Sequence, residues 1–441
     1  MSMGHRPTEQ QPELWVPTAD LPQSPGHAFY DKLNQLLSEA GFDRYVEDLC
    51  QPYYADGVGR ESIPPGTYFR MLFIGYFEGI DSQRGIAWRC SDSLSLRAFL
   101  GIPLSEETPD HSSLSRIRQR LPLDVHDQVF LHVLQIAQDK KLLRGKTVAV
   151  DATTLEANAA MRSIVRKDTG EDYKEYLKRL LTEQGVENPT DEDIRRFDKD
   201  RKKKGSNKEW ESPVDPDSRI AKMKDRRTHL AYKAEHVVDV ESEFVVAAPV
   251  YRADQSDSST LVDSILTAQI NMALAGSEQE IEEAAADKGY HKAQTLADCE
   301  AYNTRTYIPE PKGRHYKSET QGRRRAVLAN RRRIKRDKSK QLQKRRSEVV
   351  ERSFAHVCET GGARRTWLRG LEKVAKRYAV HVAAHNLALL MRKLFGIGKP
   401  RTLQGQAGGI VGMVFWLYWL STALGRRRYC RAAVGSLTAP G

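Results

Sequence analysis

Two aspartates each end a short apolar run of the kind that forms a buried strand. Asp151 follows the VAV run at 148–150, and Asp287 follows the AAA run at 284–286. Functional side chains in α/β folds gather where neighbouring strands end. If these two strands are neighbours, the two carboxylates can share a divalent cation. An aspartate after a strand also serves as an ordinary turn or cap residue, so neither position indicates a site by itself.

A third acid would have to come from a later helix, and Glu351 in the stretch VVERSF is the natural choice. It either projects from a helix packed on the sheet or stays in solvent on an exposed face. Clusters of three carboxylates suit the hard cations Mg²⁺ and Mn²⁺. Two such ions about 4 Å apart would stabilise the attacking and leaving oxygens of a phosphodiester displacement. Glu348 and Glu359 are the reserve candidates for this third position.

Composition and hydrophobic periodicity divide the chain around these acids into four segments. Residues 1–26 are polar and rich in Pro and Gln, so we expect a disordered tail. Residues 27–145 are dominated by helical periodicity and predict an all-helical N-terminal domain. Residues 146–395 alternate β-branched strands with helices and predict a mixed α/β domain. Residues 396–441 form a C-terminal tail that contains an apolar helix.

A highly charged stretch, residues 160–227, interrupts the α/β segment soon after its first strand. Its acidic and basic residues are nearly balanced and large apolar residues are few, which predicts an insertion that is part helix and part loop. Beyond it, residues 229–253 indicate a β-hairpin. A helix over 256–275 and further strands and helices follow.

Surplus positive charge is concentrated in one part of the chain. The 441 residues include 70 Lys and Arg against 58 Asp and Glu, which gives a formal net charge of +12. Segment 323–346 holds 13 basic residues and one acid, Asp337, and therefore carries the whole surplus. The composition excludes an acidic, solvating chain. The imbalance is too lopsided for self-stabilising ion pairs and favours contact with a polyanion.

Several stretches, which together run from about residue 60 to 400, point to one family. They are TYFRMLFIGYFEGIDSQRGIAWRCSDSLSLRAFLGI, PDHSSLSRIRQRL, VAVDATTLEANA, ADKGYH, VVERSFAH and LRGLEKVAKRYAVHVAAHNLALLMRKLFG. In this order, the chain resembles a bacterial insertion-sequence transposase of the DDE class. It is most similar to the IS-four/IS-five-like superfamily, in the group with a helical N-terminal transposase domain.

The resemblance implies a ribonuclease-H-like fold whose three acids bind two ions, Mg²⁺ or Mn²⁺, and which cuts and rejoins DNA. Carried over position by position, the acids are Asp151, Asp287 and Glu351. The superfamily often shows a Y-x2-R-x3-E-x6-K pattern around the Glu, and this chain departs from it, with Arg346 one residue away from the Arg position. The three positions hold Lys344, Ser347 and Cys358. We therefore transfer none of those three roles.

The resemblance also implies contacts with double-stranded DNA, at transposon ends and target. We expect them from segment 323–346, from the helix at 110–121, which either reads DNA or merely packs, and from the 160–227 insertion with Trp210 and the basic run 201–204. The candidate DNA-binding residues are Arg323, Arg324, Arg325, Arg331, Arg332, Arg333, Lys335, Arg336, Arg345, Arg346, Arg116 and Arg118. Three residues after Asp287 either touch the scissile phosphate or belong to a capped turn: Lys288, Tyr290 and His291.

The sequence leaves two other functions open. A catalytically inactive DNA-binding regulator and a metal-dependent nuclease of the same fold are the alternatives to a transposase. The family likeness further implies a homodimer on paired DNA ends and a cytoplasmic, nucleoid-associated bacterial protein.

Cysteine usage and hydropathy exclude several other kinds of protein. Five scattered cysteines without a CxxC pair argue against a disulfide framework or a structural zinc site. The first residues lack the apolar run of a secretory signal. The apolar stretch 410–424 is shorter than the roughly 20 residues of a spanning helix, so we expect it to be buried or to face a partner.

Overall fold

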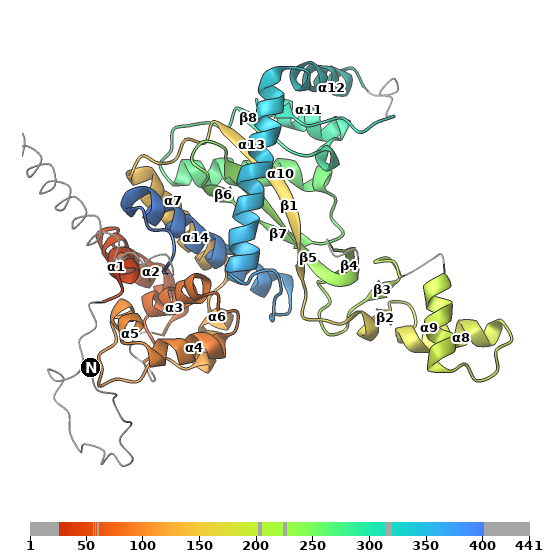
Figure 1. Cartoon of the computed structure of the whole chain (residues 1–441), viewed down its shortest axis with the longest axis horizontal. Coiled ribbons are helices and arrows are strands. Elements are labelled where there is room, and N and C mark those ends of the chain that lie inside the picture. Colours follow the sequence, from red (N-terminus) through yellow and green to blue (C-terminus); the bar gives the residue numbers. More distant parts are fainter. Residues whose placement is uncertain are drawn as a thin grey trace, which may run out of the picture.

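The computed structural model describes residues 26–400, apart from 56, 58, 60, 202–204, 224–226 and 314–319 (Figure 1). The predictions of a disordered N-terminal tail and of an apolar helix at 410–424 fall outside this part of the chain, as does most of the basic run 201–204.

Helices make up the N-terminal part of the described chain, as the periodicity predicts. They are α1 (Ala28–Glu39), α2 (Phe42–Cys50), η2 (Gln51–Tyr53), α3 (Pro65–Glu78), α4 (Gln83–Asp92), α5 (Leu94–Leu100), α6 (His111–Arg120) and α7 (Leu123–Asp139). Their ends follow local chemistry. Pro65 occupies the first turn of α3, and Gly101 ends α5 with the left-handed backbone that glycine adopts readily. Asp110 caps α6 by accepting a hydrogen bond from the Ser112 amide.

A mixed β-sheet forms the centre of the following part. Its strands are β1 (Thr147–Glu156), β4 (Arg219–Lys222), β5 (Thr228–Asp239), β6 (Val245–Ala247), β7 (Val250–Arg252), β8 (Glu283–Ala285) and β9 (Arg305–Tyr307). The order is β4-β5-β1-β8-β9, with β6 and β7 also paired to β5. β1 runs antiparallel to β5 and parallel to β8, and β8 runs parallel to β9.

Helices flank this sheet on both faces. They include α10 (Asp257–Leu274), α11 (Ala293–Ala301), α12 (Gln321–Ile334) and α13 (Asp337–Phe354). Two successive residues of β5 show the layering, because neighbouring strand residues point to opposite faces. His236 bonds to Ser353 of α13, whereas Glu235 accepts from Thr260 of α10. The predicted fold class, a ribonuclease-H-like mixed sheet flanked by helices with a helical N-terminal part, is confirmed.

One prediction about the first strand is wrong. Asp151 does not end β1, since the strand continues for five residues to Glu156. The 12-residue β5 supplies partners throughout, from Asp239 opposite Val148 to Ala231 opposite Glu156. The parallel neighbour β8 stops earlier, because its last pair is Ala149 with Ala285. Asp151 therefore lies inside a long strand, at the level where the adjacent strand ends.

The predicted insertion is part helical, as expected, but it is not entirely separate from the sheet. It contains η3 (Met161–Ser163), β2 (Val165–Arg166), α8 (Tyr173–Glu183), α9 (Asp191–Asp200) and β3 (Trp210–Glu211), and its later part supplies β4 to the main sheet. Figure 1 shows α8 and α9 projecting from one end of the molecule. Trp210 is 2% exposed and packs edge-on against Tyr173 and Tyr176. Its indole is buried in the core, so the prediction that Trp210 contacts DNA is wrong.

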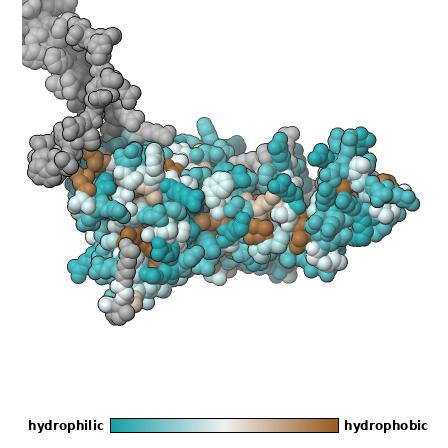
Figure 2. Space-filling model, turned by 90° about the horizontal axis from the view of Figure 1, so that it is seen from below, coloured by the Kyte–Doolittle hydropathy of each residue, from teal (hydrophilic) through white to brown (hydrophobic). Residues whose placement is uncertain are grey.

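The helix α14 (Leu371–Phe395), which follows η5 (Ala355–Thr360), connects the helical part to the sheet. It packs on α7 and α3, and its Asn386 side chain exchanges two hydrogen bonds with the Val245 backbone of β6. One hydrophobic core consequently runs through both parts. The face in Figure 2 is mostly hydrophilic, with hydrophobic residues in small separate groups. Among the described residues, no helix combines the length and apolarity needed to cross a bilayer.

Candidate active site

The structure places Asp151, within β1, and Asp287, just after β8, at the same level of two adjacent parallel strands. The last aligned pair of β1 and β8 is Ala149 with Ala285, and each aspartate follows two residues later. Asp151 Oδ1 accepts from the Ala152 amide at 2.8 Å. Asp287 caps η4 (Lys288–Tyr290) by accepting from the Gly289 amide at 2.7 Å. The backbone therefore fixes both carboxylates side by side.

The Asp151 carboxyl is electrostatically unusual. Burial raises its pKa, and the negative charge of nearby Asp287 raises it further. The positive charge of Arg346 and the Ala152 amide act in the opposite direction, but the net shift remains upward. Two close carboxylates, one of them desolvated, form a site whose negative charge favours a cation.

Arg346 of α13 provides the positive charge that contacts Asp151. Its Nη1 donates to Asp151 Oδ2 at 2.7 Å, and its Nε donates to Gln343 Oε1 at 3.1 Å. Gln343 in turn donates to the backbone oxygens of Ala286 and Tyr307, where β8 and β9 end. The helix α13 is thus fixed to the strand ends at the level of both aspartates.

The third predicted acid, Glu351, lies on the same helix but is exposed. The described residues contain no group of three His, Cys, Asp or Glu side chains arranged to hold a metal ion. The two reserve acids are already paired: Glu348 with Arg345 and Arg352, and Glu359 with Arg364. Glu351 makes no ion pair within the described part of the chain, which keeps its carboxylate available.

Two family models match the chain. A transposase domain (DUF772) covers residues 19–120, and a transposase DDE domain covers residues 276–391. The first match covers most of the N-terminal helices. The second contains Asp287 and Glu351 and begins just before β8.

Together, the two matches support an insertion-sequence DDE transposase. Neither match specifies an insertion-sequence family, so placement in the IS-four/IS-five-like superfamily stays a prediction. A search of curated proteins finds no match for this transposase.

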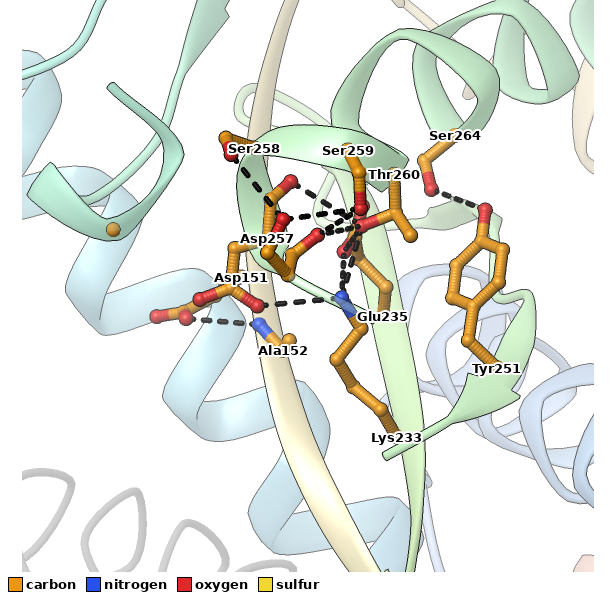
Figure 3. A network of polar contacts seen from close by, with 12 residues as sticks. Asp151, Ala152, Lys233, Glu235, Tyr251, Asp257, Ser258, Ser259, Thr260 and Ser264 are labelled. Carbon is orange, nitrogen blue, oxygen red and sulfur yellow. Dashed lines mark hydrogen bonds and ion pairs between the residues drawn. The ribbon is translucent and has the colours of Figure 1, made fainter. Parts of the chain in front are cut away.

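Sequence reasoning missed a buried polar cluster on the α10 side of the transposase sheet (Figure 3). Lys233 Nζ lies 2.9 Å from Thr260 Oγ1 and 3.3 Å from Asp257 Oδ1. Thr260 donates to Glu235, whose pKa is raised by burial. The available signal was the two charged residues, Lys233 and Glu235, inside the otherwise apolar strand YKAEHVV.

Gly289 connects this cluster to the aspartate pair. A Cβ built on Gly289 would lie 2.9 Å from Asp287 Oδ1 and 3.0 Å from Asp257 Oδ2. Asp257 therefore lies directly beside the Asp287 turn, and a Cβ at position 289 would have to displace at least one of the two carboxylates. Of the three residues predicted near the scissile phosphate, Lys288 is exposed, whereas Tyr290 and His291 are buried.

The basic segment 323–346 of the transposase forms α12 and most of α13, and its residues divide into two groups. Four of the predicted DNA-binding residues are held by the protein itself. Arg331 forms a two-pronged pair with Glu310, Arg333 donates to the Thr306 carbonyl, Arg345 pairs with Glu243, and Arg346 pairs with Asp151. The exposed group consists of Arg323, Arg324, Arg325, Arg332, Lys335 and Arg336.

The two candidate arginines of α6 also differ. Arg116 is exposed and donates to the Ser112 hydroxyl one turn earlier. Arg118 is half-buried and faces the helical core, and burial lowers the pKa of its guanidinium. Of the two, only Arg116 presents its charge on the outer surface of α6.

Proposed function

We propose that this transposase binds the terminal inverted repeats of its insertion sequence, cleaves DNA at those ends and joins them to target DNA. The observation that carries the proposal is the placement of Asp151 in β1 beside Asp287 at the end of the adjacent parallel strand β8, in a chain that matches two transposase domains. The acids Asp151, Asp287 and Glu351 are the proposed catalytic residues and metal ligands.

The side chains at the site fit a hard divalent cation. Oxygen ligands from carboxylates are those that Mg²⁺ and Mn²⁺ prefer. The raised pKa of Asp151 reflects burial and the like charge of Asp287. Both make the ionised carboxylate unfavourable, and a bound cation would offset that cost. Two such ions, when bound, would activate the attacking water or DNA 3′-hydroxyl and neutralise the leaving 3′-oxygen.

The protein's own contribution is positioning. Asp151 and Asp287 are held by backbone amides, at Ala152 and Gly289. Arg346 and Gln343 fix α13 against the strand ends, so that Glu351 comes from an anchored helix. Lys288 follows Asp287 and is exposed, which supports a proposed contact with a phosphate.

DNA binding is proposed for the exposed basic residues of α12 and the start of α13, and for Arg116. Phosphate contacts of this kind supply sequence-independent affinity, and they weaken as salt concentration rises. We propose residues 27–145 as the DNA-binding domain and 146–395 as the catalytic domain, with the 160–227 insertion within it. A homodimer on paired ends completes the proposal.

The test uses labelled DNA that carries one end of the element, with plasmid DNA as target and Mg²⁺ or Mn²⁺ present. A transposase cleaves the end and transfers the label to the plasmid. Cleavage without label transfer would instead indicate a nuclease. Binding without cleavage would indicate a DNA-binding regulator.

A further inference from the structure

A cavity of about 370 Å³ lies between the N-terminal helices and the C-terminal part of the described chain. Its walls come from α3, α4 and α6 on one side, and from α14 and the preceding residues 367–368 on the other. These walls belong to the two separate segments that match transposase domains. The volume lies within the range of small-ligand sites, about 300–1,000 Å³.

The charges that line this junction cavity are mostly positive. Arg84, Arg118 and Arg377 contribute, Lys376 is already paired with Glu372, and Asp81 is the only acid among the described lining residues. Asp81 accepts a hydrogen bond from Trp367 Nε1 at 2.9 Å. Arg377 donates to two backbone carbonyls instead of to an acid. The cavity is therefore suited to an anion.

Arg118 supplies the observation that calls for a ligand. Its Nε is buried and has no hydrogen-bond partner among the described residues. Its guanidinium makes no ion pair with any described acid, although Lys376 donates to its backbone oxygen. A half-buried cation that has lost part of its hydration without gaining an acidic partner is costly, and an anion inside the cavity would offset that cost.

The rest of the wall suits a flat aromatic group. Trp367 is 48% exposed beside the cavity, and the Arg365 guanidinium lies over its ring. Leu72, Ile80 and Val380 add apolar surface. Bases stack on aromatic side chains regardless of sequence, and arginine binds phosphate with directed hydrogen bonds. A phosphate joined to an aromatic base matches both parts of this wall.

We infer that the junction cavity binds one nucleotide of the DNA substrate, with the phosphate at Arg118 and the base against Trp367. The inference rests on the proposed function, because it takes DNA as the source of the nucleotide. Occupation would connect the N-terminal helices to α14 through the substrate. The site is thus distinct from the aspartate pair, which lies on the sheet.

The test measures tryptophan emission of the full chain in EDTA, titrated with dAMP, with inorganic phosphate and with a short single-stranded oligonucleotide. We expect quenching by dAMP and the oligonucleotide that is lost in Trp367→Phe. Arg118→Gln should weaken binding by at least about 10-fold, the effect of losing a charged hydrogen bond. Arg118→Lys, which keeps the charge, should lose less of this affinity.

Arg120→Gln is the matched control, because Arg120 lies on the same helix but stacks on Tyr54 outside the cavity. An equal loss of dAMP affinity in the Arg118 and Arg120 variants would overturn the inference. So would an affinity for inorganic phosphate as high as that for dAMP. Failure of the oligonucleotide to displace dAMP would overturn DNA as the source. The binding assay needs no metal and is therefore independent of cleavage. Nucleotide binding by a protein that does not cleave DNA would contradict only the proposed function. Cleavage of DNA by a protein that does not bind the nucleotide would contradict only this inference.

Discussion

Arg346 of α13 donates a hydrogen bond to Asp151 of β1, with 2.7 Å between Nη1 and Oδ2. The side chains are 11% and 31% exposed, so the pair is largely removed from water. It joins residues 195 positions apart in the chain. The helix that carries Glu351 is therefore attached to the strand that carries the first aspartate.

Replacing Arg346 tests the strength of this attachment. We predict that Arg346→Gln lowers the free energy of unfolding by about 1–2 kcal/mol, the range for a charged hydrogen bond that is partly screened. Urea denaturation at pH 7 measures it. Lys344→Gln is the control, because Lys344 is exposed on the same helix and should change stability by less than about 0.5 kcal/mol. Equal stability of the two variants would show that the pair does not hold α13.

The raised pKa of Asp151 gives stability a defined pH dependence. Because burial and Asp287 raise this pKa, the native protein binds a proton at Asp151 more readily than the unfolded chain does. The contribution of Asp151 to stability therefore falls as pH rises from the unfolded value, about 4, through the folded pKa. Asp151→Asn lacks this dependence. The stability of the variant relative to wild type, measured in EDTA, should increase between about pH 4 and pH 7; a decrease would contradict the assigned shift.

Gly289 tests whether the spacing of the carboxylates matters. Alanine there would bring a Cβ to 2.9 Å from Asp287 Oδ1 and 3.0 Å from Asp257 Oδ2, and so displace at least one of them. We predict a loss of cleavage rate of about 10- to 100-fold, as expected for a misplaced catalytic group. Gly322→Ala is the control, because nothing lies within 4 Å of a Cβ built on Gly322. Full activity of Gly289→Ala would separate the Asp287 turn from catalysis.

The basic segment makes a prediction about salt. Arg324, Arg332 and Arg336 are exposed and make no ion pair with a described acid, so each is free to contact a phosphate. Replacing all three with Gln should reduce the slope of log affinity against log salt by about 0.9 for each lost contact. Arg331→Gln should instead reduce stability with little change in slope, since Arg331 already pairs with Glu310. An unchanged slope in the triple variant would place the DNA surface elsewhere.

Much of the fold could be predicted from local patterns in the sequence. Helix periodicity indicated the N-terminal helices. The apolar runs before Asp151 and Asp287 indicated two strands whose neighbouring placement the structure shows. These signals lie within a few residues of one another, which is why sequence alone carries them.

What could not be predicted depends on partners distant in sequence. The extension of β1 past Asp151 to Glu156 requires β5 as a partner, and that strand follows the charged insertion in the chain. The pairing of Arg346 with Asp151, and of Arg331 with Glu310, converts predicted DNA-binding residues into structural ones. Trp210 is buried by the two tyrosines of α8, a contact that composition does not reveal.

The central claim is that Asp151 and Asp287 form the catalytic centre for DNA cleavage. The direct measurement is cleavage of a labelled transposon end by Asp151→Asn and Asp287→Asn, with DNA binding measured in parallel. Both variants should bind with wild-type affinity and lose at least about 100-fold in cleavage rate, since metal-assisted stabilisation supplies several kcal/mol. Cleavage at the wild-type rate by either variant would contradict the assignment of the site.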